Sequence, residues 1–324
     1  MRAIRIHQHG DPDVMRLEEV PLGEPGAGEV VVRNHAVGVN FTDIMHRRGD
    51  HPGSVEFPAG VGQEGAGVIE VLGDGVDEFA IGDRVAYATL PPDSYADARI
   101  VVADRVVPVP DAVDFKVAAG IILKGLTVDF LTRLAHPVVA GDTVLFHAAA
   151  GGVGLVACQW LRDLGATVIG TVGSPEKAAQ ALAHGCDHAI VYGDDDVAAR
   201  VMEITNGAGV PVVFDSVGEA TFRASLASMA PLGHLVCFGA VSGHISPVAP
   251  IELAAQSHTL TWARLPTYFA QRTDLIESAA GVFDRIERGV LVDPVSRTYA
   301  LTDAAEAHRA VENRETTGST VLIP

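Results

Sequence analysis

The chain has 324 residues, 48% of them hydrophobic and 20% charged, a composition typical of a globular protein with room for two domains. It carries 41 acidic residues against 23 Lys and Arg, a formal charge of -18, which argues against general electrostatic binding of nucleic acid or anionic membranes. No stretch predicts a membrane span or a signal peptide, and three scattered cysteines predict a reducing cytoplasm rather than a disulfide framework.

The first 110 residues predict a β-rich region. Short β-branched runs bounded by glycine, such as "GEVVVRNHAVGV" at 28–39 and "GAGVIEVLG" at 65–73, are typical of strands. "AIGDRVAYA" at 80–88 and "ADARIVVADRVVPVP" at 96–110 continue the pattern. Frequent glycine and proline between these runs favour a partly open barrel.

The pattern changes near residue 115, where "DFKVAAGIILKGLTVDFLTRL" has apolar residues at helical spacing. Strands predicted at 142–148, 166–173, 188–193, 210–218 and 233–240 then alternate with helices. Such alternation predicts a doubly wound parallel sheet covered on both faces. The tail from residue 289 returns to strands, so we expect residues 1–122 and 263–324 to form one domain into which residues 123–262 are inserted.

A glycine-rich turn, "HAAAGGVG" at 147–154, lies between a predicted strand and a predicted helix. It offers no side chains that would block a pyrophosphate, and the helix that follows contributes free N–H groups and the positive end of its dipole. The next predicted strand ends in Val172 and Gly173 rather than in the Asp or Glu that binds the ribose of NAD. Ser174 and Lys177 follow, and a hydroxyl with an ammonium group suits a 2′-phosphate. The sequence therefore favours NADPH over NADH.

These motifs resemble those of the zeta-crystallin-type NADPH:quinone oxidoreductases, a zinc-free branch of the medium-chain dehydrogenase/reductase superfamily. The resemblance covers essentially the whole chain and is most specific from Gly141 to Arg162. It also includes "VGVNFTDIMHRRG", "GQEGAGVIEVLGDGV", "LKGLTVDFL", "VFDSVG" and "TTGSTVLIP". It implies an α/β fold in which a Rossmann domain is inserted in a β-rich, GroES-like catalytic domain.

The resemblance also implies which residues bind the cofactor and the acceptor. Those expected along the pyrophosphate are Gly151, Gly152 and Val153. Those expected around the 2′-phosphate are Ser174, Lys177, Tyr192 and Arg314. Those expected near the nicotinamide are Asn40, Thr127, Phe238 and Gly239. The acceptor pocket is expected in the cleft between the domains, walled by residues 40–53 with Asn40, Met45 and His51.

Zinc alcohol dehydrogenases share this fold, but the positions matching their first two metal ligands hold Asn40 and Gln63 here. We therefore expect no metal. Without a Lewis acid, the enzyme needs an acceptor that takes hydride readily, such as a quinone or an α,β-unsaturated carbonyl, and negative charge on its oxygen needs only hydrogen-bond donors or water. Thr127, Lys124, His46 and His51 are candidate proton donors, and none of them is convincing, so the catalytic residue stays unassigned.

Three functional hypotheses remain open. The first is a zinc-independent, cytoplasmic NADPH:quinone reductase. The second is an NADPH-dependent enone or alkenal double-bond reductase with the same hydride chemistry, and the third is a non-enzymatic NADPH- or RNA-binding crystallin-like protein, which the acidity disfavours. By resemblance we expect a homodimer, paired along the last strand of the inserted sheet, "GHLVCFGA" at 233–240.

Overall fold

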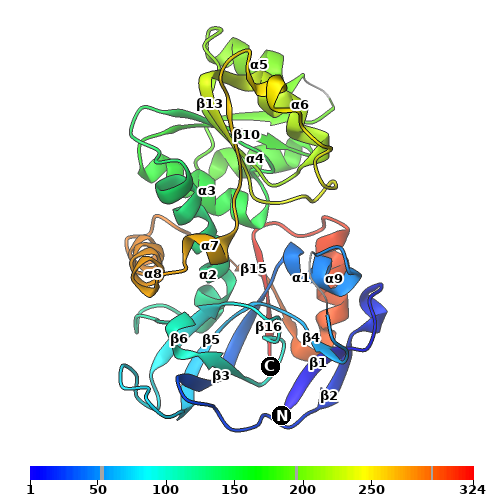
Figure 1. The fold of residues 1–324 in the computed structure, drawn as a ribbon, viewed down its shortest axis with the longest axis vertical. Helices are drawn as coiled ribbons and strands as arrows, with labels where there is room; N and C mark the ends of the chain where they lie inside the picture. The colour runs from blue at the N-terminus through cyan, green and yellow to red at the C-terminus, as the bar shows by residue number, and fades with distance from the viewer. Residues whose placement is uncertain (52–54, 194–195, 293–294) are drawn as a thin grey trace. The chain divides into compact units, whose positions relative to one another are not determined.

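The protein is described here by a computed structural model that covers residues 1–51, 55–193, 196–292 and 295–324. Its residues form two compact units: unit 1 comprises Met1–Leu126 and Gln271–Pro324, and unit 2 comprises Thr127–Ala270 (Figure 1). The boundaries expected from the sequence were at residues 122/123 and 262/263. The units of the structure meet at residues 126/127 and 270/271 instead, and the first of these boundaries lies within helix α2 (Phe115–Asp129).

Unit 1 is built on two sheets. The larger has the strand order β15-β16-β3-β5-β6-β8, with β7 paired to β3, and the smaller has the order β2-β1-β4. Strand β16 pairs antiparallel with β3, so the larger sheet contains strands from both the N-terminal and the C-terminal segment of unit 1. The strands are β1 (Arg2–Ile6), β2 (Arg16–Glu19), β3 (Glu29–Val39), β4 (Ala59–Gly60), β5 (Glu64–Leu72), β6 (Arg84–Ala88), β7 (Ala98–Val102), β8 (Val106–Pro108), β15 (Val295–Ala300) and β16 (Ser319–Ile323).

The α-helices of unit 1 are α1 (Phe41–Arg48), α8 (Arg272–Glu287), α9 (Ala304–Glu312) and most of α2. Helix α1 was not predicted, because "FTDIMHRR" is short and five of its eight residues are polar or charged. Asp43 nevertheless closes its first turn, since the carboxylate accepts a hydrogen bond from the Asn40 backbone N–H at 2.9 Å.

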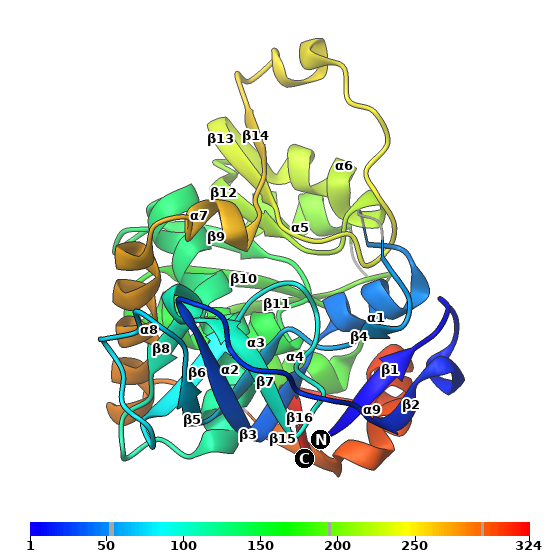
Figure 2. The same cartoon turned by 60° about the horizontal axis from the view of Figure 1, so that its bottom comes forward.

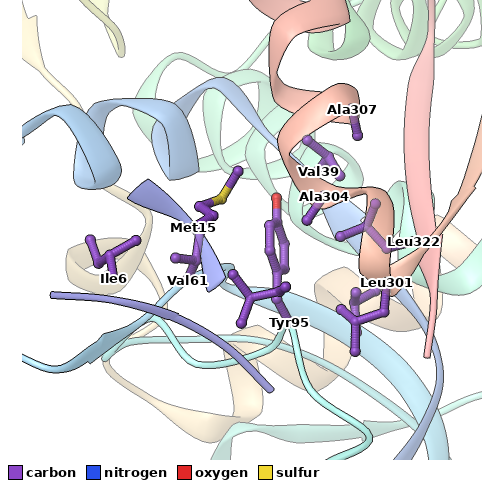
Figure 3. Close-up of a cluster of buried hydrophobic side chains, with 11 residues drawn as sticks. Ile6, Met15, Val39, Val61, Tyr95, Leu301, Ala304, Ala307 and Leu322 are labelled. Carbon is purple, nitrogen blue, oxygen red and sulfur yellow. The ribbon is translucent and has the colours of Figure 1, made fainter. Parts of the chain in front are cut away.

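A buried apolar cluster between the small sheet and α9 surrounds the ring of Tyr95 (Figure 3). The labelled side chains in this cluster are Ile6, Met15, Val39, Val61, Leu301, Ala304, Ala307 and Leu322. The Tyr95 hydroxyl lies 3.1 Å from Asp43 Oδ2 and 3.0 Å from His308 Nε2. Three titratable groups, those of Tyr95, Asp43 and His308, are thus held inside the core of unit 1.

Unit 2 contains a six-stranded sheet in the order β11-β10-β9-β12-β13-β14. Every adjacent pair is parallel, so the predicted doubly wound Rossmann-type fold is confirmed. The strands are β9 (Thr143–Phe146), β10 (Thr167–Val172), β11 (His188–Val191), β12 (Val210–Asp215), β13 (Met229–Cys237) and β14 (Thr259–Trp262). The helices are α3 (Gly152–Asp163), α4 (Pro175–Ala183), α5 (Val197–Ile204), α6 (Glu219–Ser228) and the short α7 (Leu265–Tyr268).

The edge strand of this sheet is β14, and the expectation that residues 233–240 form the edge is wrong. After β13 the chain leaves the sheet in an extended loop and returns to add β14 beside it (Figure 2). This strand was not predicted, because it has only four residues and a long irregular stretch precedes it. Among the described residues, no helix is long and apolar enough to cross a membrane.

The buried His308 leads to a prediction for stability against pH. Burial lowers the pKa of His308 to about 3, with a further lowering by the Arg47 charge. Below the ordinary histidine pKa of about 6.5, the unfolded chain therefore binds a proton that the folded chain does not, and the free energy of unfolding falls by up to about 1.4 kcal/mol per pH unit. We expect His308→Gln to reduce this loss between pH 6.5 and about pH 4, measured by urea unfolding across that range.

The matched control is His35→Gln, since His35 is an exposed histidine of the same unit. It should retain the pH dependence of the wild-type protein. Equal pH slopes for His308→Gln and the wild type would contradict the prediction.

Candidate cofactor and acceptor site

The glycine-rich turn connects β9 to α3. Ala148 has a φ of 55°, and the Gly151 N–H closes the turn on the Ala148 carbonyl at 2.8 Å. Helix α3 starts at Gly152, and its N-cap, Gly151, supplies no side-chain hydrogen bond. The first N–H groups of α3 therefore have no side-chain cap, which is the arrangement that binds a phosphate at a helix N-terminus.

Gly154 allows α3 to approach this turn closely. A Cβ atom at residue 154 would lie 2.2 Å from the Ala148 carbonyl oxygen and 2.7 Å from the Ala149 Cα atom. Those are backbone atoms that cannot turn aside, so any side chain here would push the helix away from the strand. The turn thus keeps its shape because residue 154 has no side chain.

The next crossover, from β10 to α4, contains Ser174 and Lys177, which were expected at a 2′-phosphate. Ser174 is the N-cap of α4, and its Oγ accepts a hydrogen bond from the Lys177 N–H at 3.3 Å. A Cβ at Gly173 would meet nothing within 4 Å, so there is open space beside the cap. The exposed Glu176 also lies here, and a hydrogen bond from Ser174 lowers the pKa of its carboxyl.

The remaining predicted cofactor residues of unit 2 follow other strands or lie on α2. Tyr192 follows β11, and Phe238 and Gly239 follow β13, where the Phe238 N–H bonds to the Asp215 carbonyl at 2.9 Å. Thr127 is a half-buried residue of α2. Because the carboxyl ends of parallel strands meet at one edge of a sheet, the turns after β9, β10, β11 and β13 gather at one edge.

In unit 1, Asn40 belongs to a buried charged cluster. Its Nδ2 donates to Glu64 Oε1 at 2.7 Å, and Lys124 Nζ lies 3.0 Å from the same oxygen. Glu64 Oε2 accepts the Leu123 N–H at 2.8 Å. Glu64 is fully buried and Lys124 is 4% exposed. Glu64 directly follows Gln63 but was not predicted as a site residue. Its hydrogen-bond partners Asn40 and Lys124 lie 24 and 60 positions away in the sequence.

This cluster does not fit a zinc ion. Three donors, one of them an ammonium group, already bind Glu64, and the cation opposes a second positive charge. Gln63 instead donates through Nε2 to Thr42 Oγ1 at 3.2 Å. Within residues 1–51, 55–193, 196–292 and 295–324, no group of three His, Cys, Asp or Glu side chains could hold a metal ion. The three cysteines are free and buried in unit 2.

The residues expected at the acceptor wall and at the C-terminal segment also lie in unit 1. Met45 is a half-buried residue of α1. His46 and His51 stack with ring centroids 3.7 Å apart, and burial lowers the pKa of His46 to about 4, so that ring is neutral near pH 7. Arg314 is an exposed residue just after α9, with a φ of 59°. Residues 52 and 53 of the expected wall lie outside the described residues.

A parallel nucleotide-binding sheet, inserted in a β-rich domain to which both chain ends contribute, defines the class of medium-chain dehydrogenases/reductases. Two family models of dehydrogenase domains match the chain, in agreement with this class. An alcohol dehydrogenase GroES-like domain model matches residues 26–111, and a zinc-binding dehydrogenase model matches residues 152–278.

Full-length relatives identify the family of the chain within this class. It is 44% identical to a quinone oxidoreductase of Pseudomonas aeruginosa, over 100% of this chain and 99% of the relative. It is 42% identical to a 2-haloacrylate reductase of Burkholderia sp, over 98% of both chains. The crystal structure of Escherichia coli quinone oxidoreductase complexed with NADPH superimposes with a TM-score of 0.97, at 40% identity and 100% coverage of both chains. The chain belongs to the zeta-crystallin-type quinone oxidoreductase family.

Gly154 provides a test of the turn. Helix propensity alone predicts that Gly154→Ala stabilises α3 by about 1 kcal/mol, whereas the close approach to Ala148 predicts the opposite sign. We expect Gly154→Ala to lower the free energy of unfolding by about 1–3 kcal/mol, measured by urea denaturation. Gly173→Ala is the matched control, because its Cβ enters open space, and its effect should stay within about 0.5 kcal/mol. A stabilised Gly154→Ala protein would refute the steric argument.

Proposed function

We propose that the protein is a zinc-independent oxidoreductase that transfers reducing equivalents from NADPH to a quinone. The observation that carries this proposal is the edge of the unit 2 sheet, where the uncapped start of α3 and the Ser174–Lys177 turn offer two phosphate sites. NADPH-complexed and quinone-reducing relatives of 40–44% identity support the same assignment.

Each cofactor contact is assigned to residues of this chain. Bound NADPH supplies a hydride. For the pyrophosphate we propose Gly151, Gly152 and Val153. For the 2′-phosphate we propose Ser174, Lys177, Tyr192 and Arg314. For the nicotinamide half we propose Asn40, Thr127, Phe238 and Gly239. The amide of Asn40 is fixed by its 2.7 Å hydrogen bond to Glu64, so it cannot turn freely toward solvent.

The acceptor follows from the groups that unit 1 provides. Because the cluster around Glu64 does not fit a metal ion, the described residues provide no Lewis acid to polarise a plain ketone, and an acceptor that delocalises the incoming charge is required. We propose Met45 and His51 as walls of the acceptor pocket, because a flexible thioether adapts to flat rings and an imidazole N–H donates to a carbonyl oxygen. An enone or haloacrylate double bond is a second candidate acceptor, favoured by the 42% identity to a 2-haloacrylate reductase.

Steady-state NADPH oxidation against quinones, enones and alkenals tests the proposed reaction. We expect a quinone to give the highest kcat/KM, with an activated double bond as the next best acceptor. Exhaustive chelation should leave the rate unchanged, since the cluster around Glu64 excludes a metal. Activity that disappears with chelator and returns with zinc would overturn the zinc-independent mechanism, and turnover of enones alone would favour the second candidate.

The charges at the start of α4 predict opposite effects on cofactor affinity. Lys177→Ala removes a charge-assisted contact to the 2′-phosphate, so the Kd for NADPH should rise about 10- to 150-fold. Glu176→Gln removes the repulsion of an exposed carboxylate beside Ser174, so the Kd should fall about two- to fivefold. The Kd for NADH should change less than about twofold in both variants, measured by fluorescence titration. Equal changes for the two cofactors would place the 2′-phosphate elsewhere.

The exposed edge of unit 2 suggests how the protein assembles. We propose a cytoplasmic homodimer that pairs along β14, because an uncovered edge strand carries unpaired backbone groups and Trp262 is 46% exposed there. Light scattering should give a mass of about twice 33.9 kDa. Trp262→Glu should shift the protein toward the monomer, and a monomeric wild-type protein at micromolar concentration would rule out the dimer.

A further inference from the structure

A buried histidine in unit 2 joins hydroxyl groups from three different parts of the chain. His147 directly follows β9 and is fully buried. Its Nε2 atom lies 2.9 Å from Ser225 Oγ on α6, and its Nδ1 atom lies 2.9 Å from Thr171 Oγ1 on β10. The Tyr192 hydroxyl lies 3.0 Å from the same Nδ1 atom. Two hydroxyl groups therefore compete for one ring nitrogen.

The direction of these hydrogen bonds is set at Asp215. This buried carboxylate accepts the Val217 N–H at 2.8 Å and the Gly218 N–H at 3.0 Å. Ser225 Oγ lies 2.8 Å from Asp215 Oδ2 and 3.0 Å from the Thr221 carbonyl oxygen, and because both of these groups only accept, one of them takes the single Ser225 proton. The Ser225 oxygen must then act as acceptor toward His147, so the ring proton lies on Nε2.

The other ring nitrogen then has one lone pair. Burial lowers the pKa of His147, so the ring is neutral near pH 7 and carries a single proton. With that proton on Nε2, Nδ1 accepts from one hydroxyl at a time. The Thr171 and Tyr192 hydroxyl groups also contact each other, and when Thr171 is the donor in this pair the Tyr192 proton is left for His147. In this arrangement Tyr192 directs its proton inward, although its side chain is only half-buried.

We propose that Thr171 and Tyr192 exchange as donors to His147 when a 2′-phosphate binds, so that Tyr192 becomes a hydrogen-bond donor to the phosphate. The inference rests on the proposed NADPH function, which assigns Tyr192 to the 2′-phosphate. When Tyr192 turns its proton outward, Thr171 Oγ1 is already 2.9 Å from Nδ1 and takes its place. The exchange leaves no buried nitrogen unpaired. An unpaired Nδ1 atom of His147 would weaken cofactor binding.

This exchange favours NADPH over NADH. A phosphate dianion is a stronger acceptor than the ribose hydroxyl of NADH, so only NADPH draws the Tyr192 proton outward. Thr171 thereby becomes a specificity-determining residue although it is fully buried. Its contribution acts through His147 and Tyr192 and needs no contact between Thr171 and the cofactor.

The test compares Tyr192→Phe, Thr171→Val and the double variant by fluorescence titration with NADPH and NADH. Tyr192→Phe should raise the Kd for NADPH about 10-fold, and Thr171→Val about fivefold, because each loses one hydrogen bond in the bound state. The Kd for NADH should stay within about twofold in both. The double variant should bind NADPH no more weakly than Tyr192→Phe alone, since without the Tyr192 hydroxyl there is nothing to exchange.

Two further variants separate this exchange from a loss of packing. Thr171→Ser keeps the hydroxyl and should bind both cofactors like the wild type. Thr132→Val makes the same change at another buried threonine of unit 2, whose hydroxyl donates only to the Val128 carbonyl at 2.8 Å, and should alter neither Kd. Both controls also show whether the fold tolerates such changes.

Three results would overturn the exchange: equal losses for NADPH and NADH in Thr171→Val, additive losses in the double variant, or unchanged NADPH binding in Tyr192→Phe. The proposed reaction is judged separately, by acceptor reduction. Selective and non-additive losses in a protein that reduces no quinone would refute the quinone reductase and support the exchange. A wild-type protein that binds no NADPH would refute both.

Discussion

The nucleotide-binding edge of unit 2 depends on the absence of two side chains. A Cβ at Gly154 would meet the Ala148 carbonyl oxygen at 2.2 Å, and a Cβ at Gly170 would lie 2.6 Å from the Ala149 Cβ and 2.7 Å from the Cys186 Sγ. The absence of a side chain at Gly154 lets α3 approach the turn that contains Ala148 and Ala149. The absence of a side chain at Gly170 lets β10 approach the same turn. Because protein interiors are packed as densely as crystals, neither site can accept even one methyl group without a shift of the backbone.

A buried charge pair constrains unit 1 in a comparable way. Glu64 and Lys124 are both removed from water, and removal of either partner would leave an uncompensated charge that costs about 3–5 kcal/mol. Gly38 makes room for the pair, since a Cβ there would lie 2.0 Å from Glu64 Oε1. The cluster is therefore a fixed structural unit, and Asn40 is held within it as one of three donors to the same carboxylate.

The sequence revealed the parts of the fold that depend on local periodicity. The strands and helices of unit 2 and the Ser174 cap of α4 were predictable because each depends on residues within a few positions. The short edge strand β14 was missed because its pairing with β13 spans about 25 residues of chain with little periodicity. Glu64 and His147 were missed because their hydrogen-bond partners are distant in the sequence and meet only in the folded chain.

The buried polar clusters around His147 in unit 2 and around Glu64 in unit 1 differ in their electrostatics. In unit 2, the hydroxyl groups around His147 are neutral and can exchange donor roles without creating a buried charge, which suits the proposed 2′-phosphate site. In unit 1, the Glu64–Lys124 pair is already compensated and offers neither a strong Lewis acid nor an unsatisfied carboxylate. Acceptors such as quinones, which spread the incoming charge over their own conjugated atoms, suit the acceptor site proposed for unit 1.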